Sequence, residues 1–193
     1  MELFKKYFLG IFVISLVAAG CAQQTEDDMQ EETQQKMTNY THAIAHIHAK
    51  DDQSALGTVT FKKVSEGVNV VAEISDLEEG KHGFHIHQYG DCSASDFTSA
   101  GGHYNPYGLD HGAPTDSVRH MGDMGNLPAN VAGEGTIDYV DNIIELNGPN
   151  SIIGRAVIIH SGADDFTSQP SGAAGERIAC GVIGIAEADT AGM

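Results

Sequence analysis

Short segments rich in β-branched residues alternate with glycine, asparagine, aspartate and proline along the chain after residue 39. Within them, apolar and polar positions alternate with a period of two, which is typical of strands with one buried face. We expect strands at 41–49, 56–64, 68–74, 82–89, 133–140, 143–146, 152–160 and 178–185. Eight such strands predict an all-β fold, an eight-stranded antiparallel Greek-key β-barrel of the immunoglobulin-like sandwich type.

Two stretches, 90–130 and 161–176, carry little strand pattern. Loops of this length in a compact domain usually have a function, and glycine and histidine concentrate in the first one. We therefore expect two long functional loops on the barrel. With 193 residues and 41% hydrophobic positions, the chain can build one domain plus a tail.

The chain begins with two lysines, an apolar run and small residues before Cys21, which is the anatomy of a signal peptide over residues 1–20. The last residues before Cys21 resemble a bacterial lipobox, although Ala18 replaces the usual leucine. Cleavage after Gly20 without lipidation is the alternative. We expect a lipidated N-terminus and a disordered acidic tether over 21–38, a domain over 39–193, and a lipid-anchored location in the bacterial cell envelope.

Charge and cysteine content narrow the picture further. The chain has 27 acidic and 10 basic residues, a formal charge of −17, so a nucleic-acid partner is excluded and any cation near a site matters for an anionic substrate. Three cysteines in an exported protein leave one unpaired. Cys21 is the odd one, which predicts a disulfide between Cys92 and Cys180.

Histidine is abundant, with ten in the chain, and imidazole is the commonest metal ligand. His85 and His87 lie two apart on an expected strand, so both imidazoles point to one face, and His160 ends another strand. Three imidazoles on a stiff scaffold suit copper. The first long loop then offers a set that could close a structural zinc site: His103, His111, His120 and Asp123.

Five motifs carry a family resemblance: GFHIH at 83–87, SAGGHYNP at 99–106, HMGD at 120–123, IGR at 153–155 leading to His160, and GERIACGVIG at 175–184. In this order and spacing, residues 41–187 resemble copper/zinc superoxide dismutase. The resemblance implies an antioxidant oxidoreductase that converts superoxide to oxygen and hydrogen peroxide with a redox-cycling copper (Cu2+/Cu+) and a structural Zn2+.

The resemblance also implies residue roles. The copper ligands are His85, His87, His103 and His160, and the zinc ligands are His103, His111, His120 and Asp123, with His103 bridging both metals. Asp164 links a copper histidine to a zinc histidine. Arg177 attracts the anion to the copper, and the Cys92–Cys180 disulfide ties the metal loop to the strand that follows Arg177.

Some features depart from common eukaryotic members of the family. The segment from His87 to His103 is one residue longer and places Cys92 directly after Asp91, as in bacterial envelope forms. The C-terminal sequence GVIGIA is similar to the eukaryotic type, so a homodimer is possible but its interface stays open. The alternative function is a non-catalytic copper/zinc buffer. A zinc hydrolase is a third option, but Asp123 would fill the fourth ligand position that its water needs.

Four histidines lie outside this set. His82 shares the parity of Phe84 and Ile86, so we expect it in the barrel core. His42, His46 and His48 share a strand face opposite small and apolar residues, and we interpret them as exposed, with a metal-gathering role as the minor alternative.

Overall fold

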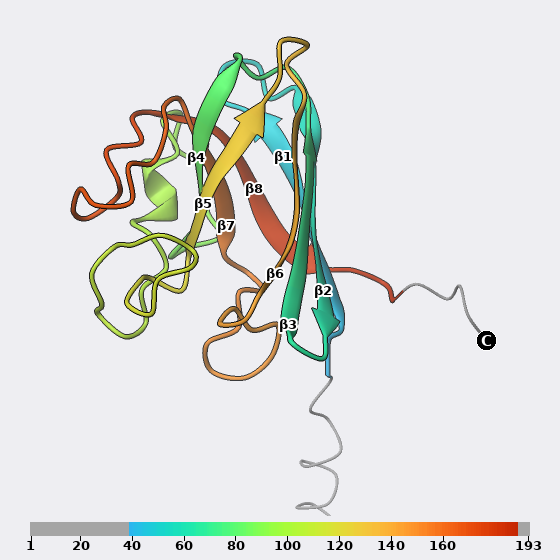
Figure 1. Cartoon of the computed structure of the whole chain (residues 1–193). Helices are drawn as coiled ribbons and strands as arrows, with labels where there is room; N and C mark the ends of the chain where they lie inside the picture. Colours follow the sequence, from blue (N-terminus) through green and yellow to red (C-terminus); the bar gives the residue numbers. More distant parts are fainter. Residues whose placement is uncertain (1–38, 189–193) are drawn as a thin grey trace, which may run out of the picture. The chain divides into compact units, whose positions relative to one another are not determined.

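The computed structural model describes residues 39–188 of the chain. Its eight strands close into one antiparallel barrel in the order β1-β2-β3-β6-β5-β4-β7-β8 (Figure 1). The strands are β1 His42–Ala49, β2 Ala55–Val64, β3 Gly67–Ile74, β4 Gly80–His87, β5 Asp123–Ala129, β6 Gly135–Asp141, β7 Ala156–His160 and β8 Arg177–Ile185. The connection from β3 to β4 passes over two intervening strands, a Greek-key order, and the predicted all-β barrel is confirmed.

The barrel core follows the alternation in the sequence. On β1, Ala43, Ala45 and Ile47 are buried while the residues between them are partly or fully exposed. Strand β4 differs, because all six residues from His82 to His87 are buried. One face of β4 packs into the barrel with Phe84 and Ile86, and the other face carries the two histidines under the long loops. The outer face of β4 is thus a second buried environment, and it is polar.

Two strand assignments need correction. The apolar segment 143–146, predicted as a strand, makes only an isolated bridge at Glu145. The Asp141 carboxylate accepts the backbone N–H groups of Ile143 and Ile144, which turns the chain there. The side chains of Ile144 and Leu146 then join the main core without extending the sheet.

Strand β5 is not predicted by the pattern, because it lies within the stretch 90–130 that we expect to be a long loop. Its sequence DMGNLPA contains glycine, asparagine and proline, which weaken a strand pattern. It pairs with β4 along most of its length but with β6 only through Ala129 and Gly135. Tertiary pairing with β4 therefore decides this element.

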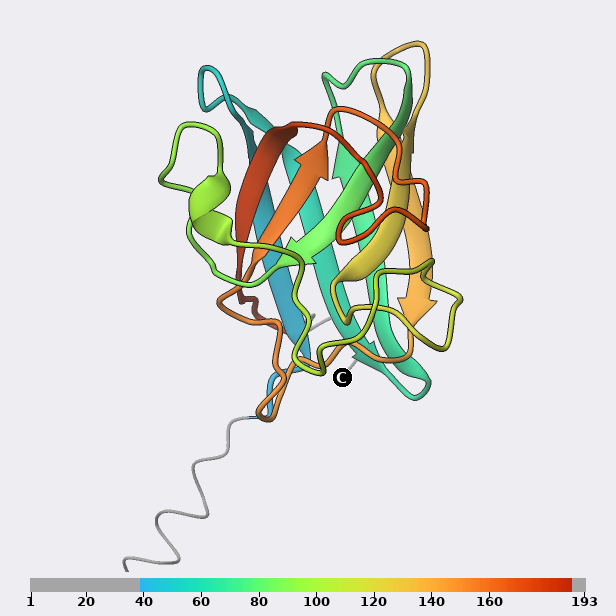
Figure 2. The same cartoon turned by 90° about the vertical axis from the view of Figure 1, so that its left-hand side faces the viewer.

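The two long loops lie on the same side of the barrel. Residues 88–122, which include the short 3-10 helix η1 (Thr98–Ala100), and residues 161–176 both gather beside β4, β5 and β7 (Figures 1 and 2). Helical structure within 39–188 is too short to cross a membrane. The loops, not the barrel interior, therefore enclose the site described next.

Candidate metal centre

The first cluster consists of four buried histidines with one ligand atom each within 4.8 Å of the others: His85, His87, His103 and His160. His85 and His87 come from β4, and His160 ends the neighbouring strand β7. His103 arrives from the first long loop, where it forms an isolated antiparallel bridge with His87. Its ring stacks on that of His85, with centroids 3.9 Å apart.

Each of these imidazoles keeps one buried nitrogen without a hydrogen-bond partner. The unpartnered atoms are Nδ1 of His85 and Nε2 of His87, His103 and His160. The opposite nitrogens are engaged; for example, His87 Nδ1 bonds the Gly101 carbonyl at 2.9 Å. Buried polar atoms normally have partners, so four unpartnered nitrogens that converge indicate a binding site for a cation. An all-imidazole set of this kind suits copper.

The second cluster gathers around one oxygen of Asp123, the first residue of β5. Asp123 Oδ1 lies 2.8 Å from His103 Nδ1, 2.9 Å from His111 Nδ1 and 3.2 Å from His120 Nδ1. Ligand atoms about 2.0 Å from a tetrahedral zinc lie about 3.3 Å from one another. Three nitrogens and one carboxylate oxygen at this spacing fit a closed zinc site.

Two further hydrogen bonds hold the Asp123 carboxylate in place. Its Oδ2 accepts the backbone N–H of His120 at 2.8 Å and that of Gly112 at 3.1 Å. Although burial raises the pKa of Asp123, the adjoining imidazoles of His103 and His120 outweigh it and hold this pKa far below its usual value. The carboxylate is therefore ionised, as a metal ligand must be.

Asp164, in the second long loop, connects the two clusters. One carboxylate oxygen lies 2.8 Å from His85 Nε2, and the other lies 2.9 Å from His111 Nε2. Gly172 leaves room for this link, since a Cβ there would lie 1.8 Å from Asp164 Oδ1. The carboxylate thus fixes the ring orientation of one histidine in each cluster.

Burial also sets the protonation of the all-histidine cluster. It lowers the pKa of His85 to about 3 and that of His160 to about 4, and it holds the pKa of His87 well below the usual value. In His111, Asp164 and Asp123 outweigh burial and raise the pKa. The neutral imidazole is the form that binds a metal, so His85, His87 and His160 can bind one at neutral pH.

Arg177 lines a cavity of about 380 Å³ together with His87, His103 and His160. Its guanidinium donates to the backbone carbonyls of Phe97 and Gly101. The Gly101 carbonyl also accepts a hydrogen bond from His87. One carbonyl therefore fixes the guanidinium relative to an imidazole of the first cluster.

The first long loop is joined covalently to the barrel. A disulfide links Cys92 to Cys180 on β8, with the Cα atoms 6.0 Å apart. The seven side chains named as metal ligands make up these two clusters, Asp164 connects them, and Arg177 lines the adjoining cavity. Cys21 is outside the described residues.

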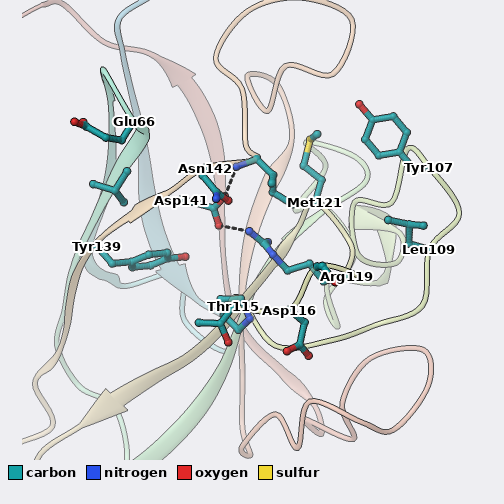
Figure 3. A pocket seen from close by; sticks show the side chains of 14 residues that line it. Glu66, Tyr107, Leu109, Thr115, Asp116, Arg119, Met121, Tyr139, Asp141 and Asn142 are labelled. Carbon is teal, nitrogen blue, oxygen red and sulfur yellow. Dashed lines mark hydrogen bonds and ion pairs between the residues drawn. The ribbon is translucent and has the colours of Figure 1, made fainter.

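Sequence reasoning missed Arg119, which contacts the backbone of two residues in the second cluster. One guanidinium nitrogen donates to the carbonyls of Asp123 at 3.0 Å and His120 at 3.4 Å. Another forms a buried ion pair with Asp141 at 2.8 Å. Figure 3 shows this pair in the pocket between the loop and β6. The available signal was its position next to His120, inside a run of ligands.

The remaining histidines take no part in either cluster. His82 is buried, and its two nitrogens bond the carbonyls of His160 and Glu78. On β1, His46 is exposed, whereas His42 and His48 are only partly so. No cluster of three or more metal-ligating groups within 39–188 includes any of these four.

A closed β-barrel that carries two adjoining ligand sets with one shared imidazole defines a protein with a two-metal centre. A sequence model of the family described as copper/zinc superoxide dismutase (SODC) matches residues 55–183. The chain belongs to this family, and its two clusters fit the family's copper and zinc.

Individual relatives agree with this assignment. The chain is 46% identical over 150 residues to the superoxide dismutase [Cu-Zn] of Cryptococcus neoformans var. grubii, covering 73% of this chain and 97% of that protein. It is 46% identical over 154 residues to the extracellular superoxide dismutase [Cu-Zn] of Drosophila melanogaster, covering 74% and 84%. The crystal structure of the clock protein EA4 matches with a TM-score of 0.71 at 43% identity, covering 77% and 97%.

Proposed function

We propose that this protein is an oxidoreductase that converts two superoxide anions and two protons to oxygen and hydrogen peroxide. The observation that carries the proposal is that His103 belongs to both ligand sets, with its Nδ1 beside Asp123 and its Nε2 buried and unpartnered. Bound copper supplies a one-electron redox couple, and zinc supplies fixed charge without redox chemistry. Complete ligand sets in both clusters, together with Arg177 in the adjoining cavity, favour an enzyme over a metal buffer.

The proposed copper ligands are His85, His87, His103 and His160, and the proposed zinc ligands are His103, His111, His120 and Asp123. His103 has a further role, because its Nε2 is buried and unpartnered while its Nδ1 lies 2.8 Å from Asp123. When this nitrogen is not bound to copper, it could accept one proton and return it to the reduced substrate, which supplies one of the two protons of hydrogen peroxide.

Arg177 guides the anion. The chain carries a formal charge of −17, so its average field repels superoxide. The guanidinium lines the cavity that leads to His87, His103 and His160, where it supplies a local positive charge. This attraction should weaken as added salt screens it.

The test is superoxide decay catalysed by the full chain loaded with one copper and one zinc. His85→Ala should abolish catalysis at matched zinc content, because it removes a copper ligand. His46→Ala, which removes an exposed histidine of β1, is the matched control and should keep the wild-type rate. No decay with the correctly metallated, disulfide-bonded protein would contradict the proposal and favour the metal buffer.

We further propose that the protein is exported and lipid-anchored in a bacterial envelope, with a signal peptide over 1–20, lipidation at Cys21, a tether over 21–38 and the enzyme domain over 39–193. Extracellular relatives in Drosophila melanogaster and Brugia pahangi support export. Labelling with a radioactive fatty acid should mark the protein and leave Cys21→Ser unmarked. An unlabelled wild-type protein after export would refute the anchor.

A homodimer is the proposed assembly. On β8, Val182 and Ile185 are 43% and 55% exposed, which gives an apolar surface that a second copy could cover. Light scattering should give twice the chain mass for the wild type and the monomer mass for Val182→Glu. A monomeric wild type would refute it.

A further inference from the structure

Phe97 is unusual in both its backbone and its environment. Its φ of 58° and ψ of 17° lie in the left-handed region, which a side-chain-bearing residue adopts only with support. Its side chain is nevertheless only 1% exposed, although it belongs to a loop. The contacts around the buried ring must therefore hold the backbone of Phe97 in this disfavoured conformation.

The ring of Phe97 packs in a small apolar cluster that is separate from the main core. Its other members are Ala100, Ala156, Ile158 and Cys180, with Cys92 against them. Along β7, Val157 and Ile159 face the main core, and Ala156 and Ile158 alternate with them. The cluster therefore lies on the outer face of β7, and Phe97 attaches the first long loop there.

The guanidinium of Arg177 depends on this loop. Within residues 39–188, its hydrogen bonds go to the carbonyls of Phe97 and Gly101 only. Those two carbonyls flank η1, whose closing hydrogen bonds run from Ala100 to Phe97 and from Gly101 to Thr98. The position of Phe97 therefore sets both acceptors of the guanidinium.

The disulfide attaches the same loop at a different place. Cys92 lies five residues before Phe97, and the intervening chain turns through hydrogen bonds such as Phe97 N–H to the Ala94 carbonyl at 2.9 Å. The bridge fixes the start of the loop, whereas the buried ring fixes the segment that bonds Arg177. The two attachments lie five residues apart in the chain and differ in chemistry, although Cys180 and Cys92 also pack in the apolar cluster that holds the ring.

We propose that Phe97 is the positioning residue for Arg177: its buried ring holds the carbonyl that orients the guanidinium, and it does so when the Cys92–Cys180 disulfide is reduced. This inference rests on the proposed superoxide dismutation for its kinetic consequence. The orientation of Arg177 itself does not depend on turnover, so it can be measured separately.

The first experiment measures the orientation of Arg177 without turnover. The metal-loaded full chain is treated with phenylglyoxal, which modifies arginine, and the modified arginines are located by peptide mass mapping. Phe97→Ala should accelerate modification of Arg177 several-fold, and Phe97→Leu should restore slow modification. Phe61→Leu, a substitution in the main core, controls for a general loss of stability. Unchanged modification of Arg177 in a folded Phe97→Ala protein overturns the proposal.

The second experiment measures kcat/KM against ionic strength at matched copper and zinc content. Phe97→Ala should lower kcat/KM by about tenfold at low salt and flatten its salt dependence. It should cause no further loss in an Arg177→Ile background, because its effect passes through Arg177. A full additional loss in that background would overturn the proposal and assign the effect to His87 through Gly101.

The third experiment tests independence from the disulfide. After reduction with metals retained, the wild type should keep the salt dependence and slow Arg177 modification, and Phe97→Leu should do the same. If reduction alone frees Arg177 as fully as Phe97→Ala does, the independent role of Phe97 is wrong. If the metal-loaded, disulfide-bonded wild type is inactive but Phe97→Ala still accelerates modification of Arg177, the positioning role stands and the proposed function fails.

Discussion

The two ligand sets are built from different parts of the fold. Of the four histidines proposed for copper, His85, His87 and His160 lie on strands of the barrel. In the set proposed for zinc, only Asp123 lies on a strand, and the three histidines come from the loop before it. The barrel therefore positions the first set, whereas hydrogen bonds around Asp123, Asp164 and Arg119 must position the second.

This difference parallels the chemistry proposed for each metal. A redox metal benefits from ligands that stay fixed when its charge changes, and strands give that rigidity. A closed structural site can instead order the loop that supplies its ligands, so that metal binding adds to folding stability. Perturbing the loop network should accordingly separate the two sites.

Asp123→Ala should cause the largest effect. It removes the carboxylate shared by three imidazoles and two backbone N–H groups, which leaves buried polar groups unpartnered. We expect loss of zinc and about 3–5 kcal/mol of unfolding free energy. Denaturant unfolding and metal analysis measure both. Glu73→Ala, on the exposed face of β3, is the control, and a zinc-replete Asp123→Ala protein would break the contrast.

Arg119→Met should act on the zinc set alone. The substitution frees the carbonyls of His120 and Asp123 and leaves Asp141 buried without its ion-pair partner, which destabilises the fold by about 3 kcal/mol. Zinc should dissociate faster while copper affinity stays near wild type, as chelator competition can measure. Equal losses of both metals would show that the barrel does not position the copper set independently.

Asp164→Asn should weaken both sets together, because this carboxylate bonds His85 and His111. Loss of such a connecting group typically lowers metal affinity about 10–100-fold. Competitive metal titration of the variant should therefore show reduced affinity for copper and for zinc. A loss confined to one metal would contradict the connecting role of Asp164.

The metal-free protein should lose stability in acid. The pKa of His85 is lowered to about 3 and that of His160 to about 4, so below pH 6.5 the unfolded chain binds more protons than the folded one. Stability present above pH 6.5 falls toward pH 4 by up to about 1.4 kcal/mol per pH unit for each such histidine. Urea unfolding at several pH values measures this slope, and a flat profile would show that these imidazoles protonate while folded.

Particular elements show how far a sequence pattern reaches. Alternation predicted β1, and it predicted that His85 and His87 share one face of their strand, since period-two geometry is local. It failed for β5, where pairing with β4 overrides weak strand residues. It also failed for 143–146, where the Asp141 turn directs apolar side chains into the core without a sheet.

The sequence by itself determined the strand periodicity, the β-barrel class and the residue types that a copper and zinc protein requires. These three features follow from local backbone geometry and side-chain chemistry, which depend only on the order of residues in the chain. Only the tertiary structure decided that Arg119 supports the zinc set and that the Phe97 carbonyl meets Arg177, 80 residues apart in sequence. Such contacts depend on how loops fold back onto the barrel, and no local pattern encodes that distance.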